Sequence, residues 1–228
     1  MDNNVLSFFQ LCDSNFPNGA FSHSFGLESY IQADKVHNQE TFAEWLEVYL
    51  MEQLVYADGL AARIVYEALN EQDLDVICEM DRLLTVQNIA RETREGTQQM
   101  GKRMVKIADS IFNAPLLSLY KDRINQKEAF GHSVLVFTMI GHHLNIPKQT
   151  TILYYLYSTV VSLVQNAVRA IPLGQTAGQK IIYSFQEKLK EAIGKIEQLE
   201  KLDFGAISPG IELSQMQHER VNVRIFMS

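Results

Sequence analysis

Glycine and proline are scarce in this sequence. The 12 glycines and 5 prolines together make up about 7 % of the 228 residues, against roughly 12 % in an average protein. A chain with so few turn-forming residues has few places to end short strands, so its composition favours long helices. The hydrophobic fraction of 46 % and the charged fraction of 21 % are typical of a globular protein, which excludes a disordered or fibrous chain.

Positive charge is also in short supply. The chain has 20 Lys and Arg against 27 Asp and Glu, a net charge of −7. Binding to a phosphate backbone needs a concentrated positive face, so no nucleic acid is expected as a partner. The N-terminus has no basic residue before its first apolar stretch, unlike a secretory signal. We therefore expect a cytoplasmic protein.

Cysteine and metal-ligand patterns are nearly absent. Cys12 and Cys78 are the only two thiols, which excludes a disulfide framework and a cysteine zinc site and predicts reduced, mostly buried cysteines. The six histidines contain no pair at the spacing of three or four that a helix-borne metal site needs. No permanently bound metal or cofactor is expected, while transient or subunit-bridging coordination by His23 or His218 remains open.

Several segments have apolar residues at the spacing of a helix. Apolar residues recur at steps of three and four from Leu46 to Ala68, as on one face of a long helix. Thr41 and Glu44 form a capping-box pattern near the start of that helix. Further helices are predicted over about 72–88, 91–112, 129–144 and 181–199. No convincing strand pattern precedes residue 220.

The longest apolar run, Ile152–Ile171, is twenty residues long and requires a choice between a membrane span and a core helix. Gln165, Asn166 and Arg169 favour the core, because such groups are costly inside a bilayer. The sequence therefore predicts an all-α fold without a membrane span. It is a single-domain helical bundle, residues 1–228, around this central apolar helix.

The two ends of the chain depart from this regularity. The N-terminal segment, 1–20, leads into a stretch rich in Gly, Pro, Ser and aromatic residues, and we expect a structured loop that enters a helix near Phe21. The tail, 205–228, ends in the alternating residues 221–227 with no strand to pair with. Such a tail either frays or becomes ordered on a partner.

One short motif imitates a phosphate-binding loop. Residues Gly96–Lys102 match it, but Arg103 stands where a Ser or Thr would bind magnesium, and a polar stretch precedes the first glycine in place of a strand. We interpret the match as coincidental, so the chain itself is not expected to hydrolyse nucleotides.

No residues occur at a spacing typical of a catalytic site either. Neither Cys12 nor Ser24 lies in a known nucleophile motif. An interaction or scaffolding protein is therefore the leading class. The alternative is a small helical enzyme whose acid-base site is built from residues such as Asp13, His23 and Glu28.

Three segments resemble the urease accessory protein F (UreF) family. The first is Leu11–Glu28, which contains Phe-Pro-Asn-Gly-Ala-Phe-Ser-His-Ser-Phe-Gly-Leu-Glu. The second is Gly131-His132 followed by Ile-Pro-Leu-Gly-Gln-Thr-Ala-Gly-Gln at 171–179. The third is Met216–Glu219 with the ending Arg-Ile-Phe-Met-Ser. The segments occur in the family's order from end to end, and the one departure is Asn18, where many relatives have a small apolar residue.

This resemblance implies an all-α, dimer-forming accessory protein without chemistry of its own. In the family such proteins act with UreD (also called UreH) and UreG to deliver nickel into apo-urease. The resemblance implies that such a protein bridges UreD and UreG and modulates the GTPase. GTP hydrolysis belongs to UreG, and nickel is handled by the complex as a whole.

We hypothesise that the two irregular ends form the surface that binds UreD, with the tail becoming ordered as it docks. The residues assigned to this surface are Phe21, Ser22, Ser24, Gly26, Glu28, His218, Glu219, Arg224 and Phe226. The 171–176 stretch is either a plain turn, in which Pro172 ends one helix and Gly174 reverses the chain, or a partner surface. In the second case Gln175 and Gln179 contact the partner.

Overall fold

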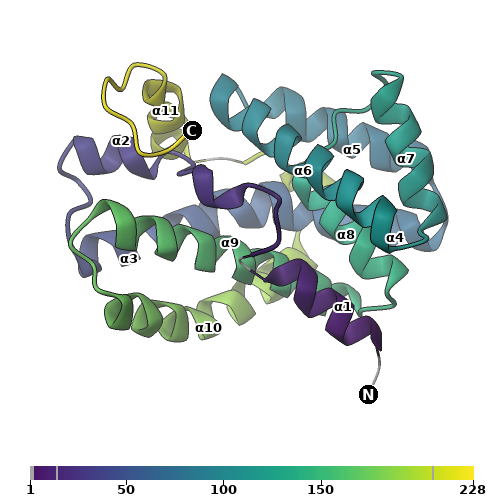
Figure 1. Ribbon diagram of the computed structural model, residues 1–228, viewed down its shortest axis with the longest axis horizontal. Helices are drawn as coiled ribbons and strands as arrows, with labels where there is room; N and C mark the ends of the chain where they lie inside the picture. Colours follow the sequence, from purple (N-terminus) through teal and green to yellow (C-terminus); the bar gives the residue numbers. More distant parts are fainter. Residues whose placement is uncertain (1–2, 14, 207) are drawn as a thin grey trace.

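The computed structural model describes residues 3–13, 15–206 and 208–228, so positions 1–2 and 14 of the predicted N-terminal segment and position 207 of the predicted tail lie outside it. All regular elements in the described part are helical, and the prediction of an all-α fold is confirmed (Figure 1). The elements are α1 (Asn3–Cys12), the 3₁₀ turn η1 (Ala20–Ser22), α2 (Leu27–Gln32), α3 (Gln39–Val48), the π-helical segment η2 (Tyr49–Gly59), α4 (Leu60–Asn70), α5 (Leu74–Gln87), α6 (Arg91–Ile111), α7 (Pro115–Asn125), α8 (Ser133–His143), α9 (Lys148–Ala170), α10 (Gln175–Gln198), the 3₁₀ turn η3 (Lys201–Asp203) and α11 (Pro209–His218).

The core is one connected apolar cluster that extends from Phe8 in α1 to Ile211 in α11. The helix α9 lies in its middle and contacts α8, α10, α4 and η2, as well as elements close to the N-terminus. The apolar run identified in the sequence is therefore a central core helix. Within the described residues, no helix has both the length and the apolar character needed to cross a membrane.

The most enclosed helix is nevertheless α8. Every residue from Ser133 to Gly141 is buried, whereas α9 buries one face and leaves Tyr154, Tyr157 and Ser162 half-buried. The longest apolar run of the sequence is therefore buried on one face of α9 and not all round. Its tyrosines and hydroxyl residues pass as apolar in a hydropathy pattern, yet they lie where a polar atom can reach water or a cavity.

Residues 39–70 form one continuous helical run, as the periodicity predicts, and Leu46, Leu50 and Leu54 are all buried. Two details differ. The helix is capped by Asn38, whose side-chain oxygen accepts from the Thr41 N–H at 2.9 Å, so the expected Thr41–Glu44 box is wrong. The capping box is formed by Asn38 and Thr41, with Thr41 as the third residue of the helix. The π-helical turns of η2 have no signature in the apolar spacing.

The N-terminal segment contains a helix that the sequence did not indicate. Phe8 and Leu11 of α1 are buried, and the Phe8 ring contacts Phe137 at a centroid distance of 5.4 Å. No acidic residue lies in its first turn and no basic residue in its last, so the usual charge pattern of helix ends is missing. This helix forms because its apolar face packs against α8 and α9.

The turn after α9 does not use Gly174 as expected. Gly174 precedes the first residue of α10 with φ −72°, which any residue can adopt, and nothing lies within 4 Å of a Cβ placed there. The reversal therefore does not require glycine. Pro172 follows the end of α9 at Ala170, as predicted.

The stretch Gly96–Arg103 lies inside α6. Both of its glycines are packing positions, since a Cβ on Gly96 would meet the His23 ring and one on Gly101 would meet the Gly131 carbonyl. A phosphate loop needs free N–H groups before a helix begins. The interpretation of this motif as coincidental is confirmed.

Candidate partner-binding site

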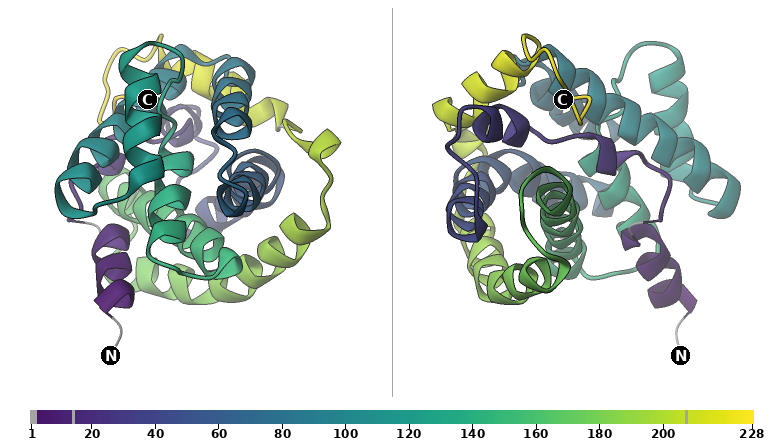
Figure 2. Two further views of the ribbon diagram at one scale, coloured as in Figure 1. Left: turned by 90° about the vertical axis from the view of Figure 1, so that its right-hand side faces the viewer. Right: turned by 60° about the vertical axis from the view of Figure 1, so that its left-hand side comes forward.

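The two irregular ends of the chain lie side by side. The tail, drawn in yellow, lies against the purple segment that contains η1 and α2 (Figure 1, Figure 2), and α11 packs on α2. The backbone of Ser24 donates to the Ser228 carbonyl at 2.5 Å, and Met227 donates to Ser22 at 2.8 Å. We call residues 20–28 and 219–228 together the loop–tail surface.

Glu28, on the first turn of α2, is the main anchor of the tail. Its carboxylate is buried and accepts from the backbone N–H groups of Ile225 at 2.6 Å and Phe226 at 3.1 Å. The same carboxylate lies 2.9 Å from the His218 Nε2. Hydrogen bonds to an ionised group are among the stronger ones in proteins, so Glu28 fixes the path of the tail.

His218 ends α11 and is fully buried. Its Nδ1 lies 2.7 Å from a carboxylate oxygen of Glu92 in α6, whose second oxygen accepts from Arg224 at 2.7 Å. These two partners favour the ionised carboxylate, and the pKa of Glu92 is lowered although its partial burial opposes this. Side chains from α2, α6, α11 and the tail thus form one charged cluster.

His23 packs under the end of the tail. Its Nδ1 lies 2.9 Å from the Ser228 hydroxyl, and its carbonyl accepts from the side-chain amide of Asn166 in α9 at 2.8 Å. Burial lowers the pKa of His23 to about 4, with smaller effects from the charges of Arg103 and His218. His23 is therefore neutral at physiological pH.

Arg169, near the end of α9, connects the loop to the tail. Its guanidinium lies 5.1 Å from the Phe226 ring centroid and 6.0 Å from that of Phe21, and it donates to the Phe21 carbonyl and to Asn166. Phe226 is buried here while Phe21 is exposed. Arg169, noted in the sequence as a reason against a membrane span, is a positioning residue of this surface.

Gly26 allows α11 to pack closely against the start of α2. Its φ of +92° lies in the left-handed region that favours glycine. A Cβ at this position would also clash with the Ser214 hydroxyl of α11. The sequence assigned Gly26 to the partner surface, but the structure places it between α2 and α11.

The residues predicted to bind a partner separate into two groups. Phe21, Glu219 and Arg224 are exposed and Ser22 is half-buried, so they are available to a partner. The inner group holds the surface together, and its members are Ser24, Gly26, Glu28, His218 and Phe226.

The tail was expected to become ordered on docking. In the structure it is already packed on its own chain, because Glu28, Glu92 and Ser24 supply its hydrogen bonds.

Gln175 and Gln179 lie elsewhere, on the first turns of α10, and both are exposed. They are four residues apart and therefore share one helix face. Their predicted role in binding a partner stays a prediction.

The predicted site residues did not include the exposed apolar residues of the tail. Val223, Ile225 and Met227 are exposed, and the alternation that marked them was visible in the sequence. Glu92 had no such signal, because its partners are more than 120 residues away along the chain.

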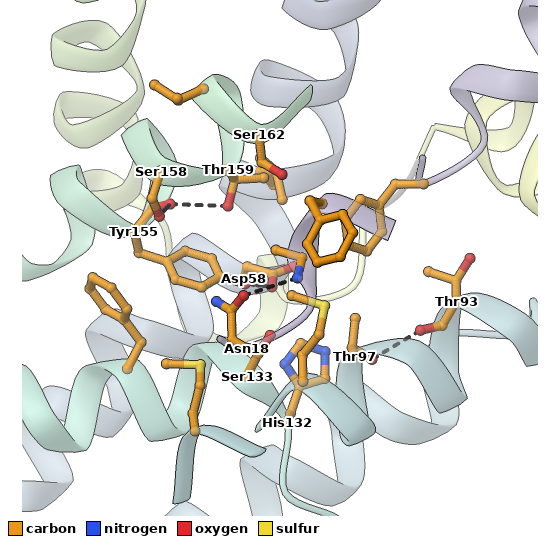
Figure 3. Close-up of a pocket in the computed structure, with 18 of the residues that line it drawn as sticks. Asn18, Asp58, Thr93, Thr97, His132, Ser133, Tyr155, Ser158, Thr159 and Ser162 are labelled. Carbon is orange, nitrogen blue, oxygen red and sulfur yellow. Dashed lines mark hydrogen bonds between the residues drawn. The ribbon is translucent and has the colours of Figure 1, made fainter. Parts of the chain in front are cut away.

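A cavity of about 320 Å³ lies behind the loop, and Thr97, His132 and Thr159 are among the residues that line it (Figure 3). Phe21 and Arg169 also belong to its lining. Its walls carry hydroxyl and amide side chains from α6, α8, α9 and η2. The Tyr155 hydroxyl donates to Asp58 at 2.8 Å, and the buried hydroxyls of Thr93 and Ser133 lack a hydrogen-bond partner within the described residues. The cavity lining is largely apolar, and these hydroxyls are the places in it where ordered water can bind.

The Gly131-His132 turn of the second family motif is held by a buried carboxylate. Asp81 of α5 accepts from the N–H groups of Phe130, Gly131 and His132 at 2.6, 2.9 and 3.1 Å. His132 in turn lines the cavity. No sequence pattern distinguishes Asp81, because the loop that it holds lies about 50 residues further along the chain.

The alternative acid-base site is not favoured by the structure. Glu28 and His23 are both engaged with the tail, and the lowered pKa of His23 leaves it without a proton to donate near neutral pH. Asp13 is exposed at the rim of the cavity.

Both cysteines are half-buried free thiols with raised pKa values, about 12 for Cys12 because of burial. The described residues contain no group of three or more His, Cys, Asp or Glu suited to a metal ion.

Comparison with known proteins identifies the family. A family model described as UreF matches residues 36–186. A relative from Bacillus sp. (strain TB-90), named urease accessory protein UreF, is 49 % identical over 226 residues, covering 99 % of this chain and 100 % of the relative. The family model matches the helical core. The alignment with the relative also covers both irregular ends. The chain therefore belongs to the UreF family of urease accessory proteins.

Proposed function

We propose that this protein is a non-catalytic scaffold for urease maturation that acts in the cytoplasm. It binds UreD (UreH) through the loop–tail surface, holds the GTPase UreG in the same complex and modulates its GTP hydrolysis. The complex, together with apo-urease, inserts the nickel. The protein acts as a homodimer and holds no permanent metal or cofactor of its own.

One observation carries the proposal: the loop–tail surface presents large apolar side chains to solvent. Phe21, Val223, Ile225 and Met227 are 64 %, 79 %, 59 % and 58 % exposed. Single exposed apolar residues are common, but several on adjoining segments with charged neighbours are typical of a protein interface. These residues lie on two adjoining segments that are hydrogen-bonded to each other.

Charges flank this apolar group, as at the rim of many interfaces. Arg224 is bonded to Glu92, and Glu219 lies 3.3 Å from Arg91. The inner anchors hold the tail in place before any partner arrives. A pre-organised surface loses less conformational entropy on binding than a disordered one, which supports tight binding to UreD.

The experiment compares the full chain with a variant that ends at Arg220, which lacks most of the tail but keeps His218. Co-purification with UreD is measured, and then nickel-dependent urease activity after mixing with UreD, UreG and apo-urease. We expect the truncated chain to lose both. A double variant, Tyr183→Ser with Leu202→Ser, is the matched control because both side chains are exposed and apolar but lie outside the loop–tail surface.

Undiminished co-purification of the truncated chain with UreD would exclude the loop–tail surface as the binding site. Circular dichroism of the truncated chain separates this outcome from a loss of folding. A helical spectrum equal to that of the full chain is expected, because the deleted residues, 221–228, contain no helix.

A further inference from the structure

The buried imidazole of His218 lies between two carboxylates. Its Nε2 is 2.9 Å from Glu28 and its Nδ1 is 2.7 Å from Glu92. A carboxylate only accepts hydrogen bonds, so each of these contacts needs an N–H on the ring. A neutral imidazole has one N–H, and the doubly protonated ring has two. With both carboxylates ionised, the arrangement is satisfied in full only when His218 carries both protons.

We propose that His218 is a proton-dependent latch for the tail. With both protons it bridges Glu28 and Glu92 and holds the tail in the arrangement that presents the apolar residues. Loss of one proton breaks one of the two bridges and loosens the tail. This inference rests on the proposed function in one respect, that the latched tail is the form that binds UreD.

The two carboxylates accept three of the hydrogen bonds that hold the tail, so one proton at His218 bears on several of its anchors. Glu28 shares its oxygens between His218 and the N–H groups of Ile225 and Phe226. Glu92 shares its oxygens between His218 and Arg224. A change at His218 therefore reaches the tail through both of its charged anchors.

The charges around His218 balance only in the protonated state. Two carboxylates then face two cations, the imidazolium and the Arg224 guanidinium. After deprotonation Arg224 alone faces two carboxylates, one of them buried, and a buried charge without its partner is strongly destabilising. The charged and titratable groups around His218 are Glu28 from α2, Glu92 and Arg91 from α6, Glu219 and Arg224 from the tail, and His23 from the loop.

His23 does not replace the missing charge. Its pKa is lowered to about 4 by burial and by the charges of Arg103 and His218, so it is neutral at physiological pH. Arg91 and Glu219 compensate each other at the exposed edge. The contacts of the tail that do not involve the two carboxylates are the backbone bonds at Ser22 and Ser24, the Ser228 hydroxyl at His23, the bond from the Gln32 side-chain amide to the Val223 carbonyl, and the buried ring of Phe226.

The test follows the His218 ring and the tail in the same sample of the full chain. Nuclear magnetic resonance of protein labelled with ¹⁵N in histidine reports how many protons the ring carries and the pH at which the second one leaves. Amide hydrogen exchange is then measured below and above that pH and expressed as protection relative to an unfolded peptide. We expect protection at Ile225 and Phe226 to fall at least about tenfold on deprotonation, with no change at Leu163 in α9.

A ring that carries a single proton while the tail is protected overturns the proposal. So does protection at Ile225 and Phe226 that stays the same across the titration. The ring measurement uses the native protein, so a variant that fails to fold does not affect it.

Two variants sharpen the test. His218→Gln removes the titrating group, and the pH step in tail protection is expected to disappear. His37→Gln is the control, because His37 also lies beside a carboxylate, Asp34, but its side chain is 52 % exposed and distant from the tail in sequence; its pH step should equal that of the native chain. A step that persists in a folded His218→Gln protein contradicts the latch.

Binding to UreD at the same two pH values separates the latch from the proposed function. A loss of affinity that follows the exchange step supports regulation of binding by the latch. An exchange step with unchanged affinity leaves the latch standing but overturns its role in binding. Absence of UreD binding at both pH values overturns the proposed function, while exchange still decides the latch.

Discussion

The central helices and the tail of this protein are held by different interactions. In α8 every residue from Ser133 to Gly141 is buried, and α9 buries a continuous apolar face. From Glu219 to the end, in contrast, only Phe226 and Ser228 are buried. The tail is held by charged side chains and backbone bonds, chiefly at Glu28 and Glu92.

This difference assigns separate roles to the two regions. Apolar burial supplies most of the free energy of folding. A charged cluster contributes less to stability, because desolvation opposes its attraction, but it selects one arrangement of the groups it joins. The central helices therefore account for the fold and the charged cluster for the shape of the loop–tail surface. The predictions below test this separation.

The largest effect on stability is expected in α9. Leu163 is fully buried, and Leu163→Ala should lower the free energy of unfolding by roughly 2–5 kcal/mol, because it leaves a cavity. Urea denaturation measures this. Leu202, at 94 % exposure, provides the control, since Leu202→Ala should change stability by less than about 0.5 kcal/mol. Equal effects at the two positions would contradict the role given to the core.

A second effect should appear as the pH is lowered. The pKa of His23 is lowered from 6.5 to about 4 in the folded protein. The unfolded chain therefore binds this proton at a higher pH than the folded protein does. Stability should therefore fall by roughly 3 kcal/mol as the pH decreases from 6.5 towards 4.

Urea denaturation at several pH values, for the native chain and His23→Gln, isolates this contribution. The variant should lose less stability over the same range. Parallel pH profiles for the two proteins would mean that His23 is not held neutral.

Glu28→Gln should affect the tail more than the core. The substitution removes the charge that pairs with His218 and weakens the bonds to the Ile225 and Phe226 amides. We expect a loss of about 1–3 kcal/mol, with amide exchange faster in the tail and unchanged in α9. Glu191→Gln, at an exposed position of α10, serves as the control. Faster exchange throughout the chain would contradict a local role.

The smallest effect on folding is expected at Arg224. Its ion pair with Glu92 is partly exposed, so Arg224→Ala should cost less than about 1 kcal/mol. Binding to UreD should nevertheless weaken, because Arg224 both anchors the tail and lies at the edge of the apolar group. Arg220→Ala, also exposed in the tail, is the comparison for calorimetric binding. Normal complex formation by Arg224→Ala would leave Arg224 only a role in solubility.

Much of the fold could be predicted because helical periodicity is a local property. The apolar spacing of 46–68 gave a helix whose face is buried, and Gln165, Asn166 and Arg169 led correctly to a core position for α9. The helix α1 was missed because packing stabilises it, without charged residues at its ends. The π-helical turns of η2 were missed because apolar spacing does not distinguish them from α-helix.

The candidate site was predictable only in part. The two irregular ends stood out by composition, and the structure brings them together. Which residues face inward was not visible, because the burial of Glu28 and His218 depends on contacts that join positions 190 residues apart. Glu92 and Asp81 were not predicted as site residues for the same reason. In the sequence, a carboxylate that binds a distant segment cannot be distinguished from one on the surface.

The central claim is that UreD binds the apolar side chains of the loop–tail surface, and the most direct test is the dissociation constant of the UreD complex. The double variant Ile225→Ser with Met227→Ser removes exposed apolar side chains and leaves the backbone bonds of the tail in place. Tyr183→Ser with Leu202→Ser is the control with the same number of exposed apolar side chains removed. The account predicts at least about tenfold weaker binding for the first variant and native binding for the second. Native affinity in the first variant would contradict it.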